Sequence, residues 1–394
     1  MAVRRLKDKI FEVGAIDFDR RLFDELIPLP EGTSYNSYLV QGSDKTALLD
    51  TVDPAKVSSL VENLNELSIE KIDYIIAHHA EQDHSGSLPF ILELFPMAKV
   101  VTNAKCKEML ISLLLLPEEK FIVINDREIL SLGDKTLEFI FAPWVHWPET
   151  MLTYLKEDKI LFTCDFFGSH LAAAPLFVTD QPHVLRSAKR YYAEIMMPFR
   201  TSIKQHLEKL KTVDFTIIAP SHGPVYDQPE MIMDAYADWA GDQVKNEVVL
   251  PYVSMHGSTQ EMVEYLINAL IARGIVVKPY NLSRTDIGEL AMDLVDAATI
   301  VIGTPTVLVG PHPLAAYAAL LANALRPKTK FASIIGSFSW GGKMVEMLSA
   351  AISNLKVTVI EPVIAKGAPR EAEYAALDNL ADEIKKSHQA AGIV

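Results

Sequence analysis

The pattern of hydrophobic and polar positions changes along the chain, with a transition near residue 244. Residues 1–243 contain many short strand-like runs and few helical segments, which predicts two sheets covered by helices. One helix is indicated between Val57 and Leu67, where apolar residues recur at helical spacing. The strand-like runs around it include Ser37–Val40, Thr46–Leu49, Lys99–Thr102 and Phe121–Ile124. Periodicity alone does not select one arrangement of these sheets.

Strands and helices alternate from Glu247 onward, which is a different pattern. The expected strands are Glu247–Ser254, Val276–Tyr280, Thr299–Gly303, Phe331–Gly336 and Val357–Ile360, and the expected helices are Gln260–Ala272, Leu314–Ala324, Lys343–Leu355 and Arg370–Ser387. Five apolar strands separated by helices predict a parallel, doubly wound sheet. We therefore expect an α/β protein with two domains, 1–243 and 247–394, and a boundary within Asp238–Asn246.

Four potential metal ligands lie within six residues of one another. His79, Glu81, Asp83 and His84 follow closely on the apolar run Ile72–Ala77. A strand that ends in two imidazoles and two carboxylates predicts a metal site. The alternative is a solvated polar turn, which is disfavoured because these groups would repel and desolvate one another unless something bound them.

Three further candidates each follow a β-rich run: His146 after Leu137–Ala142, Asp165 after Lys159–Cys164, and His222 after Phe215–Ala219. Together the four imidazoles and three carboxylates exceed the ligands of one tetrahedral zinc. They suit two metals, and Asp165 can bridge both through its two oxygens. Glu81 favours iron or manganese over zinc, because carboxylate oxygens prefer harder ions.

A second candidate site is formed by loops of the second domain. The hexapeptide Ser254–Thr259 lies between its first strand and first helix, where amide groups and the helix dipole favour a phosphate. There is no Walker lysine and no Gly-x-Gly-x-x-Gly, so a single terminal phosphate fits better than a triphosphate or dinucleotide. The alternative for this hexapeptide alone is an ordinary strand–helix turn.

Two more loops belong at the same sheet edge. Thr304–Leu308 follows the third strand and Gly336–Gly342 follows the fourth, and ligands of open parallel sheets bind at the carboxyl ends of strands. Phe338 and Trp340 could stack on a flat ring there. The candidate cofactor-binding residues are Ser254, Met255, His256, Gly257, Ser258, Thr259, Pro305, Thr306, Val307, Leu308, Ser337, Phe338, Ser339, Trp340, Gly341 and Gly342.

The metal motif resembles that of the flavodiiron proteins, also called A-type flavoproteins. The resemblance rests on His-x-Glu-x-Asp-His at 79–84, on the three later ligands, and on the segments Gly32–Leu39, His146–Glu149 and Ser221–Pro224. It extends over nearly the whole chain. It implies a metallo-β-lactamase-like αββα sandwich with a di-iron site, followed by a flavodoxin-like domain with FMN.

The resemblance also implies roles for individual residues. One iron would be held by His79, Glu81, His146 and Asp165, and the other by Asp83, His84, Asp165 and His222. Members of the family differ in whether the imidazole at His84 reaches the iron. Two departures concern the flavin loops: Val307 and Leu308 stand where many members have an Asn, and Ser339 stands where many have a Gly.

We expect a cytoplasmic protein from the composition. The formal net charge of −14 argues against nucleic acid or an anionic membrane as partner, and a hydrophobic content of 49% suffices for full cores. The N-terminus lacks the apolar segment of a signal peptide. Cys106 and Cys164 form no Cys-x-x-Cys pair, so no rubredoxin module is encoded in this sequence. Cys164 should point away from the face that carries Asp165, because strand residues alternate.

The expected function is reduction of dioxygen to water, of nitric oxide to nitrous oxide, or of both, at two irons per chain with electrons relayed through FMN. The resemblance further implies a head-to-tail homodimer, possibly a tetramer, and an external donor such as rubredoxin. Tyr191 and Tyr192 could supply a phenol near the irons, although structural packing is favoured for both. The alternatives are a glyoxalase-like zinc hydrolase with a flavin-free appended domain, and an electron-transfer flavoprotein with a vestigial metal site.

Overall fold

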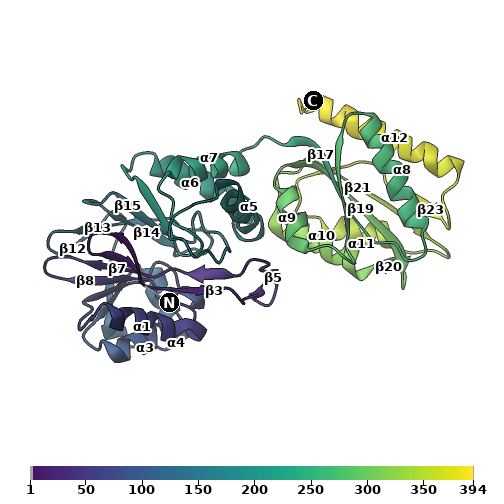
Figure 1. Cartoon of the computed structure of the whole chain (residues 1–394). Helices are drawn as coiled ribbons and strands as arrows, with labels where there is room; N and C mark the ends of the chain where they lie inside the picture. The colour runs from purple at the N-terminus through teal and green to yellow at the C-terminus, as the bar shows by residue number, and fades with distance from the viewer. Residues whose placement is uncertain (1–2, 394) are drawn as a thin grey trace. The chain divides into compact units, whose positions relative to one another are not determined.

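The computed structural model describes residues 3–393, which form two compact units (Figure 1). The first unit comprises the described residues up to Tyr192 together with Phe199–Ala240. The second comprises Ala193–Pro198 together with the described residues from Gly241 onward. Within residues 3–393, no helix combines the length and the apolar character that crossing a membrane requires.

Two sheets face each other in the first unit. The first sheet has the order β1-β2-β7-β8-β9-β10-β11, and the second the order β12-β13-β14-β15-β16. The strands of the first sheet are β1 (Arg4–Lys7), β2 (Ile10–Glu12), β7 (Tyr38–Gln41), β8 (Thr46–Leu49), β9 (Tyr74–Ile76), β10 (Lys99–Thr102) and β11 (Phe121–Val123). Those of the second are β12 (Ile129–Ser131), β13 (Thr136–Phe141), β14 (Met151–Leu155), β15 (Ile160–Cys164) and β16 (Ile217–Pro220).

Helices cover the outer faces of these sheets, and two small strand pairs complete the unit (Figure 1). The helices are α1 (Val57–Glu66), α2 (Gln82–Ser85), α3 (Leu88–Leu94), α4 (Ala104–Leu114), α5 (Gln181–Tyr191), α6 (Arg200–Leu210) and α7 (Pro229–Ala240). The small pairs are β3 (Ala15–Asp17) with β6 (Thr33–Tyr35), and β4 (Leu22–Phe23) with β5 (Ile27–Pro28).

Successive residues of β9 and β10 serve two different cores. Ile76 and Val101 pack between the two sheets, where they meet Phe139 and Phe162 of the second sheet. Ile75 and Val100, one position earlier, pack against α1, α3 and α4. Burial on both faces explains why these strands are apolar at nearly every position. It also leaves only the strand ends free to carry polar side chains.

The second unit is a parallel sheet with the strand order β18-β17-β19-β21-β22. Its strands are β17 (Lys245–Tyr252), β18 (Val276–Asn281), β19 (Ala297–Val307), β20 (Gly310–Pro311), β21 (Phe331–Phe338), β22 (Thr358–Val359) and β23 (Val363–Lys366). Its helices are α8 (Ser258–Ala272), α9 (Ile287–Leu294), α10 (Pro313–Leu325), α11 (Met344–Ala351) and α12 (Glu371–Ala390). α8 and α12 cover one face, and α9, α10 and α11 cover the other.

The predicted fifth strand of this sheet is divided in two. β22 pairs with the start of β21, and β23 pairs with its end. Pro362 lies between them and has no backbone N–H for the ladder, which accounts for the interruption. The sequence prediction did not include β23 or α9. The latter begins at the N-cap Asp286, whose carboxylate accepts a hydrogen bond from the Gly288 amide.

Candidate functional site

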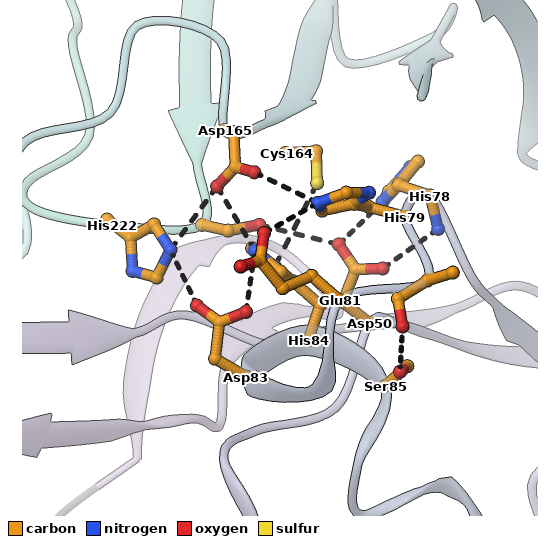
Figure 2. Close-up of polar contacts among 12 residues, drawn as sticks. Asp50, His78, His79, Glu81, Asp83, His84, Ser85, Cys164, Asp165 and His222 are labelled. Atoms are coloured by element: carbon orange, nitrogen blue, oxygen red, sulfur yellow. Dashed lines mark hydrogen bonds and ion pairs between the residues drawn. The ribbon is translucent and has the colours of Figure 1, made fainter. Parts of the chain in front are cut away.

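The predicted metal ligands converge at the strand ends of the first unit. β9 leads into the turn with His79 and Glu81, and the short helix α2 then carries Asp83 and His84. His146 lies between β13 and β14, Asp165 directly follows β15, and His222 follows β16 shortly after. Figure 2 shows the resulting cluster, in which side chains from both sheets point toward one another. All seven predicted ligands lie at this one place.

One group of ligands consists of His79, Glu81, His146 and Asp165, whose ligand atoms all lie within 4.8 Å of one another. Glu81 Oε2 is 3.0 Å from Nε2 of His79 and 3.0 Å from Nε2 of His146. Asp165 Oδ2 lies 3.5 Å and 3.4 Å from the same two nitrogens. The four side chains thus point at one small volume from three different loops.

The second group consists of Asp83, His84 and His222. Nε2 of His222 is 3.1 Å from Asp83 Oδ2, and Nε2 of His84 is 3.4 Å from Asp83 Oδ1. Asp165 joins this group through its other oxygen, because Oδ1 lies 3.1 Å from Nε2 of His84 and 3.3 Å from Nε2 of His222. The two oxygens of one carboxylate therefore serve two different groups, which is the geometry of a bridging ligand.

The hydrogen bonding of this cluster is incomplete without a cation. Both carboxylate oxygens of Asp83 and Nε2 of His84 are buried; they lie at ion-pair distance from neighbouring groups of the cluster, but none of them makes a hydrogen bond. A buried polar atom without a partner costs about 1–3 kcal/mol, more when it is charged. Three carboxylates with four neutral imidazoles carry excess negative charge, which two divalent cations would neutralise. The donor set therefore fits a pair of metal ions.

The electrostatics of the cluster favour positive charge at its centre. Burial opposes protonation of His146, but Asp165 and Glu81 outweigh it and raise the pKa of His146 to about 10. Against the same burial, Asp165 and Asp83 raise the pKa of His222 to about 9. Burial would raise the pKa of Asp165, yet the imidazoles, led by His84, hold it well below its usual range. A metal ion would take the place of these protons.

Several residues that sequence reasoning did not assign hold the ligands in orientation. Glu149 Oε1 lies 2.8 Å from Nδ1 of His79 and accepts a hydrogen bond from the Ala80 amide at 3.0 Å. Nδ1 of His222 is 2.6 Å from the carbonyl oxygen of Ser34. Such contacts fix which ring nitrogen faces a metal. Glu149 and Ser34 both lie in segments on which the family resemblance was based. Membership of these segments was the only sign in the sequence that the two residues belong to the site.

The two tyrosines differ in their surroundings. Tyr191 is buried, and its hydroxyl donates a hydrogen bond to Asp165 Oδ1 at 2.9 Å. Tyr191 is therefore packed in the core, as the interpretation favoured from the sequence expected, and its phenol also contacts the carboxylate shared by both ligand groups. Tyr192 packs against Tyr236 and Trp239, as expected of a core residue.

Cys164 does not point away from the site, so the expectation based on strand alternation is wrong. Its Sγ is 3.9 Å from Nδ1 of His84. The register between β15 and β16 shifts between Phe162 and Cys164, and Cys164 has a φ of 51°. This irregularity breaks the alternation at the strand end. The thiol is buried, and burial raises its pKa well above the usual range.

The flavin-loop candidates gather around one pocket at the carboxyl edge of the second unit's sheet. The pocket is lined by Ser254, Met255, His256, Ser258, Thr259, Pro305, Thr306, Leu308, Val309, Ser337, Phe338, Ser339, Trp340, Gly341 and Gly367. Gly257 and Val307 are not among these lining residues, and Gly342 lines an adjoining pocket. Val309 and Gly367 were not predicted. The first follows the predicted loop, and the second follows β23, which the sequence analysis missed.

This pocket has the features that a phosphate and a flat ring require. α8 begins at Ser258, directly after Gly257, whose φ is 96° and which provides no side-chain cap. Backbone N–H groups at the start of this helix are therefore suited to an anion. The Thr259 and Ser337 hydroxyls meet at 3.1 Å. Trp340 is 89% exposed, so its ring is available for stacking.

Comparison with known proteins identifies the family of this chain. Residues 33–223 match a family described as ODP family beta lactamase. A nitric oxide reductase of Moorella thermoacetica is 34% identical over 362 residues, which cover 90% of each chain. A flavo-diiron protein of Clostridium acetobutylicum is 33% identical over 380 residues, or 92% of this chain and 93% of the relative. The chain belongs to the flavodiiron protein family.

The fold supports the same assignment over both units. The solved structure of rubredoxin oxygen:oxidoreductase from Desulfovibrio gigas aligns with a TM-score of 0.95 at 29% identity, covering 98% of this chain and 99% of that one. The prediction of a metallo-β-lactamase-like domain and a flavodoxin-like domain is thereby confirmed. As a flavodiiron protein the chain is an oxidoreductase, and the zinc hydrolase alternative is disfavoured.

Proposed function

We propose that this flavodiiron protein reduces dioxygen to water, nitric oxide to nitrous oxide, or both, at two irons held by the seven clustered ligands, with electrons relayed through FMN. The division of the two Asp165 oxygens between two buried ligand groups is the observation that carries this proposal. A hydrolase with a single zinc has no need of such a bridge.

The proposed cofactors match the demand of the reaction for electrons. Dioxygen requires four electrons and four protons to become two waters, and two nitric oxide molecules require two electrons and two protons to become nitrous oxide and water. When bound, a reduced flavin and a diferrous pair would supply two electrons each. A flavin and an iron pair that are both fully reduced could therefore together complete the reduction of dioxygen without releasing partly reduced oxygen.

The protein residues in this proposal position the metals and hold a proton near them. Glu149 and the Ser34 carbonyl oxygen fix the rings of His79 and His222. Burial and the neighbouring Asp165 raise the pKa of Tyr191 well above its usual range, so the phenol keeps its proton. That proton lies at Asp165 Oδ1, on the side of the second ligand group. Tyr191 can thus donate a hydrogen bond beside a reacting oxygen atom.

In the second unit, we assign the flavin phosphate to the start of α8 and the flavin ring to the loops after β19 and β21. Ser258 and Thr259 would meet the phosphate, and Trp340 would stack on the ring. Leu308 lines the pocket where many family members have an amide side chain nearby. Polar contacts to the ring would then come from backbone groups.

We further propose a cytoplasmic head-to-tail homodimer, possibly assembled into a tetramer, that receives electrons from an external donor such as rubredoxin. The D. gigas relative is named for rubredoxin, which supports this class of donor. A dimer of this kind would let the flavin of one chain serve the irons of the other.

The direct test is an anaerobic single-turnover experiment. Protein reduced at both flavin and iron is mixed with limiting dioxygen or nitric oxide, and flavin oxidation and products are followed together. We expect water without hydrogen peroxide from dioxygen, and nitrous oxide from nitric oxide, with at least one gas reacting rapidly. Slow flavin oxidation by both gases, with hydrogen peroxide as the main product of dioxygen, would contradict the proposal.

A further inference from the structure

The ring of His84 has a sulfur atom beside its outer nitrogen, where two other ligand rings have an oxygen atom. Its Nδ1 lies 3.9 Å from Sγ of Cys164, whereas Nδ1 of His79 and of His222 lie 2.8 Å and 2.6 Å from oxygen atoms. Figure 2 shows the Cys164 side chain directed toward the His84 ring. Because sulfur is a weak hydrogen-bond acceptor, this ring is held less firmly than the other two.

The backbone of His84 is fixed, which leaves the ring as the adjustable part of the residue. The His84 carbonyl oxygen accepts hydrogen bonds from the Thr51 amide at 2.8 Å and from the Thr51 hydroxyl at 2.6 Å. The His84 amide donates a hydrogen bond to the Glu81 carbonyl oxygen at 3.1 Å, at the start of α2. These contacts do not limit rotation of the side chain, so the orientation of the ring depends on the groups around it.

The carboxylate of Asp50 lies near the same place but is engaged by other residues. Asp50, His84 and Cys164 each place a polar side-chain atom within 4.8 Å of the other two. Asp50 Oδ1 accepts a hydrogen bond from the His78 amide at 2.9 Å, and Oδ2 lies 2.8 Å from Nδ1 of the same residue. The Ser221 hydroxyl also donates to Oδ2, at 3.4 Å. Sγ of Cys164 is therefore the acceptor available to the outer nitrogen of His84.

The irregular end of β15 brings the sulfur to this position. Cys164 has a φ of 51°, and the register with β16 shifts between Phe162 and Cys164. With regular alternation its side chain would lie on the face opposite that of Asp165. A left-handed backbone is uncommon for a residue other than glycine, and such outliers cluster at functional sites.

We propose that Cys164 is a positioning residue for His84. Its Sγ accepts a hydrogen bond from Nδ1–H, which leaves the lone pair on Nε2 and directs that nitrogen into the second ligand group. There, Nε2 is buried, makes no hydrogen bond and lies 3.1 Å from Asp165 Oδ1. The inference rests on the proposed function, because it assumes a metal ion at the second group. Cys164 itself touches neither the metal nor the substrate.

The test measures how well the full-length holoprotein retains iron against a competing chelator, in the wild type and in Cys164→Ala. Without the sulfur, the Nδ1–H of His84 is buried with no acceptor. Loss of such a partner costs about 10–100-fold in metal affinity, and we expect about tenfold because sulfur accepts weakly. Only one of the two irons should be affected, and Mössbauer spectra should change at one iron site. A thiol that acted only through packing would weaken both irons or neither.

Two further variants separate positioning from packing. Cys164→Asn is the rescue variant, because Asn readily adopts the left-handed backbone and its amide oxygen reaches farther than a thiol sulfur. We expect it to retain iron at least as well as the wild type. Cys106→Ala is the matched control, since it removes the other buried thiol, whose Sγ lies 4.0 Å from the Ala77 carbonyl oxygen. Iron retention should be unchanged in that variant, and FMN is measured in all of them.

The outcomes separate this inference from the proposed function. Wild-type retention of both irons in Cys164→Ala would overturn the role of Cys164 and leave the proposed function intact. Equal loss of both irons would also overturn it, as would a folded Cys164→Asn that loses iron as readily as Cys164→Ala. A wild-type protein without an iron pair would overturn the proposed function and this inference together.

Discussion

At the scale of single residues, Asp165 has the contacts that matter most. Its two oxygens face different ligand groups, and Tyr191 donates a hydrogen bond to one of them. Asp83, in contrast, contacts only the second group. One carboxylate therefore affects both metal positions and the other affects a single position, which substitutions can separate.

We predict that Asp165→Asn removes more iron than Asp83→Asn. An amide supplies only one oxygen, so the bridge is lost and both positions weaken, whereas Asp83→Asn should spare the position at His79. Iron per chain is measured after purification, with FMN content as the control for the second unit. The bridging role is wrong if Asp165→Asn retains full iron and full turnover.

The candidate ligands could be predicted from the sequence, but most of the residues that hydrogen-bond to them and orient them could not. His79, Glu81, Asp83 and His84 stand in one motif, whereas the contact of Glu149 with His79 joins positions 70 apart. Cys164 was misplaced because a register shift is invisible in an apolar run.

At the scale of elements, the positions of both candidate sites follow from where the strands end. Apolar strands buried on both faces can present polar groups only where they end, and for that reason the ligand positions and the loops after β17, β19 and β21 could be predicted. The β4–β5 hairpin could not, because its strands have only two residues each and no periodicity. The helix α9 was also missed.

We predict that Trp340→Ala weakens FMN binding or shifts the flavin potential while leaving iron in place. Trp340 lies in the loop after β21 with 89% of its surface exposed, where a flavin ring can stack on it. Flavin affinity and the redox titration of the bound flavin are the measurements. Unchanged values for both would place Trp340 away from the ring.

We predict that the second unit loses stability as the pH falls from about 6.5 to about 4, because of His388 in α12. Its buried ring lies 2.6 Å from Thr299 Oγ1 and 2.8 Å from Asn246 Oδ1, and burial lowers the pKa of His388 to about 4. In this window the unfolded chain binds a proton that the folded unit does not, which costs up to about 3 kcal/mol.

The measurement for His388 is urea unfolding at pH 7.5 and pH 4.5, followed by the fluorescence of released flavin. His388→Gln keeps hydrogen-bonding capacity but cannot titrate, so its loss of stability between the two pH values should be smaller than that of the wild type. Equal losses in both proteins would remove His388 as the cause.

At the scale of the whole molecule, each of the two units carries one of the two candidate cofactor sites. All seven candidate metal ligands belong to the first unit, and the candidate flavin pocket belongs to the second. The change in hydrophobic pattern near residue 244 predicted two domains, but no pattern in the sequence indicated that Ala193–Pro198 groups with the second unit.

We predict that two inactive full-length variants restore activity in a mixed dimer. His79→Ala removes an iron ligand, and Thr259→Asp places a negative charge where the flavin phosphate would bind. In a head-to-tail dimer of the two, one junction pairs an intact flavin with intact irons. Activity is measured against the mixing ratio, with subunit exchange verified independently. Verified mixed dimers without activity would show that electrons pass within one chain.

The most direct test of the central claim is the cofactor content of the purified protein, determined by metal analysis and a visible spectrum. The shared Asp165, the buried atoms of Asp83 and His84 that make no hydrogen bond, and the pocket at α8 predict two irons and one FMN per chain. One zinc per chain and no flavin absorption would contradict the account.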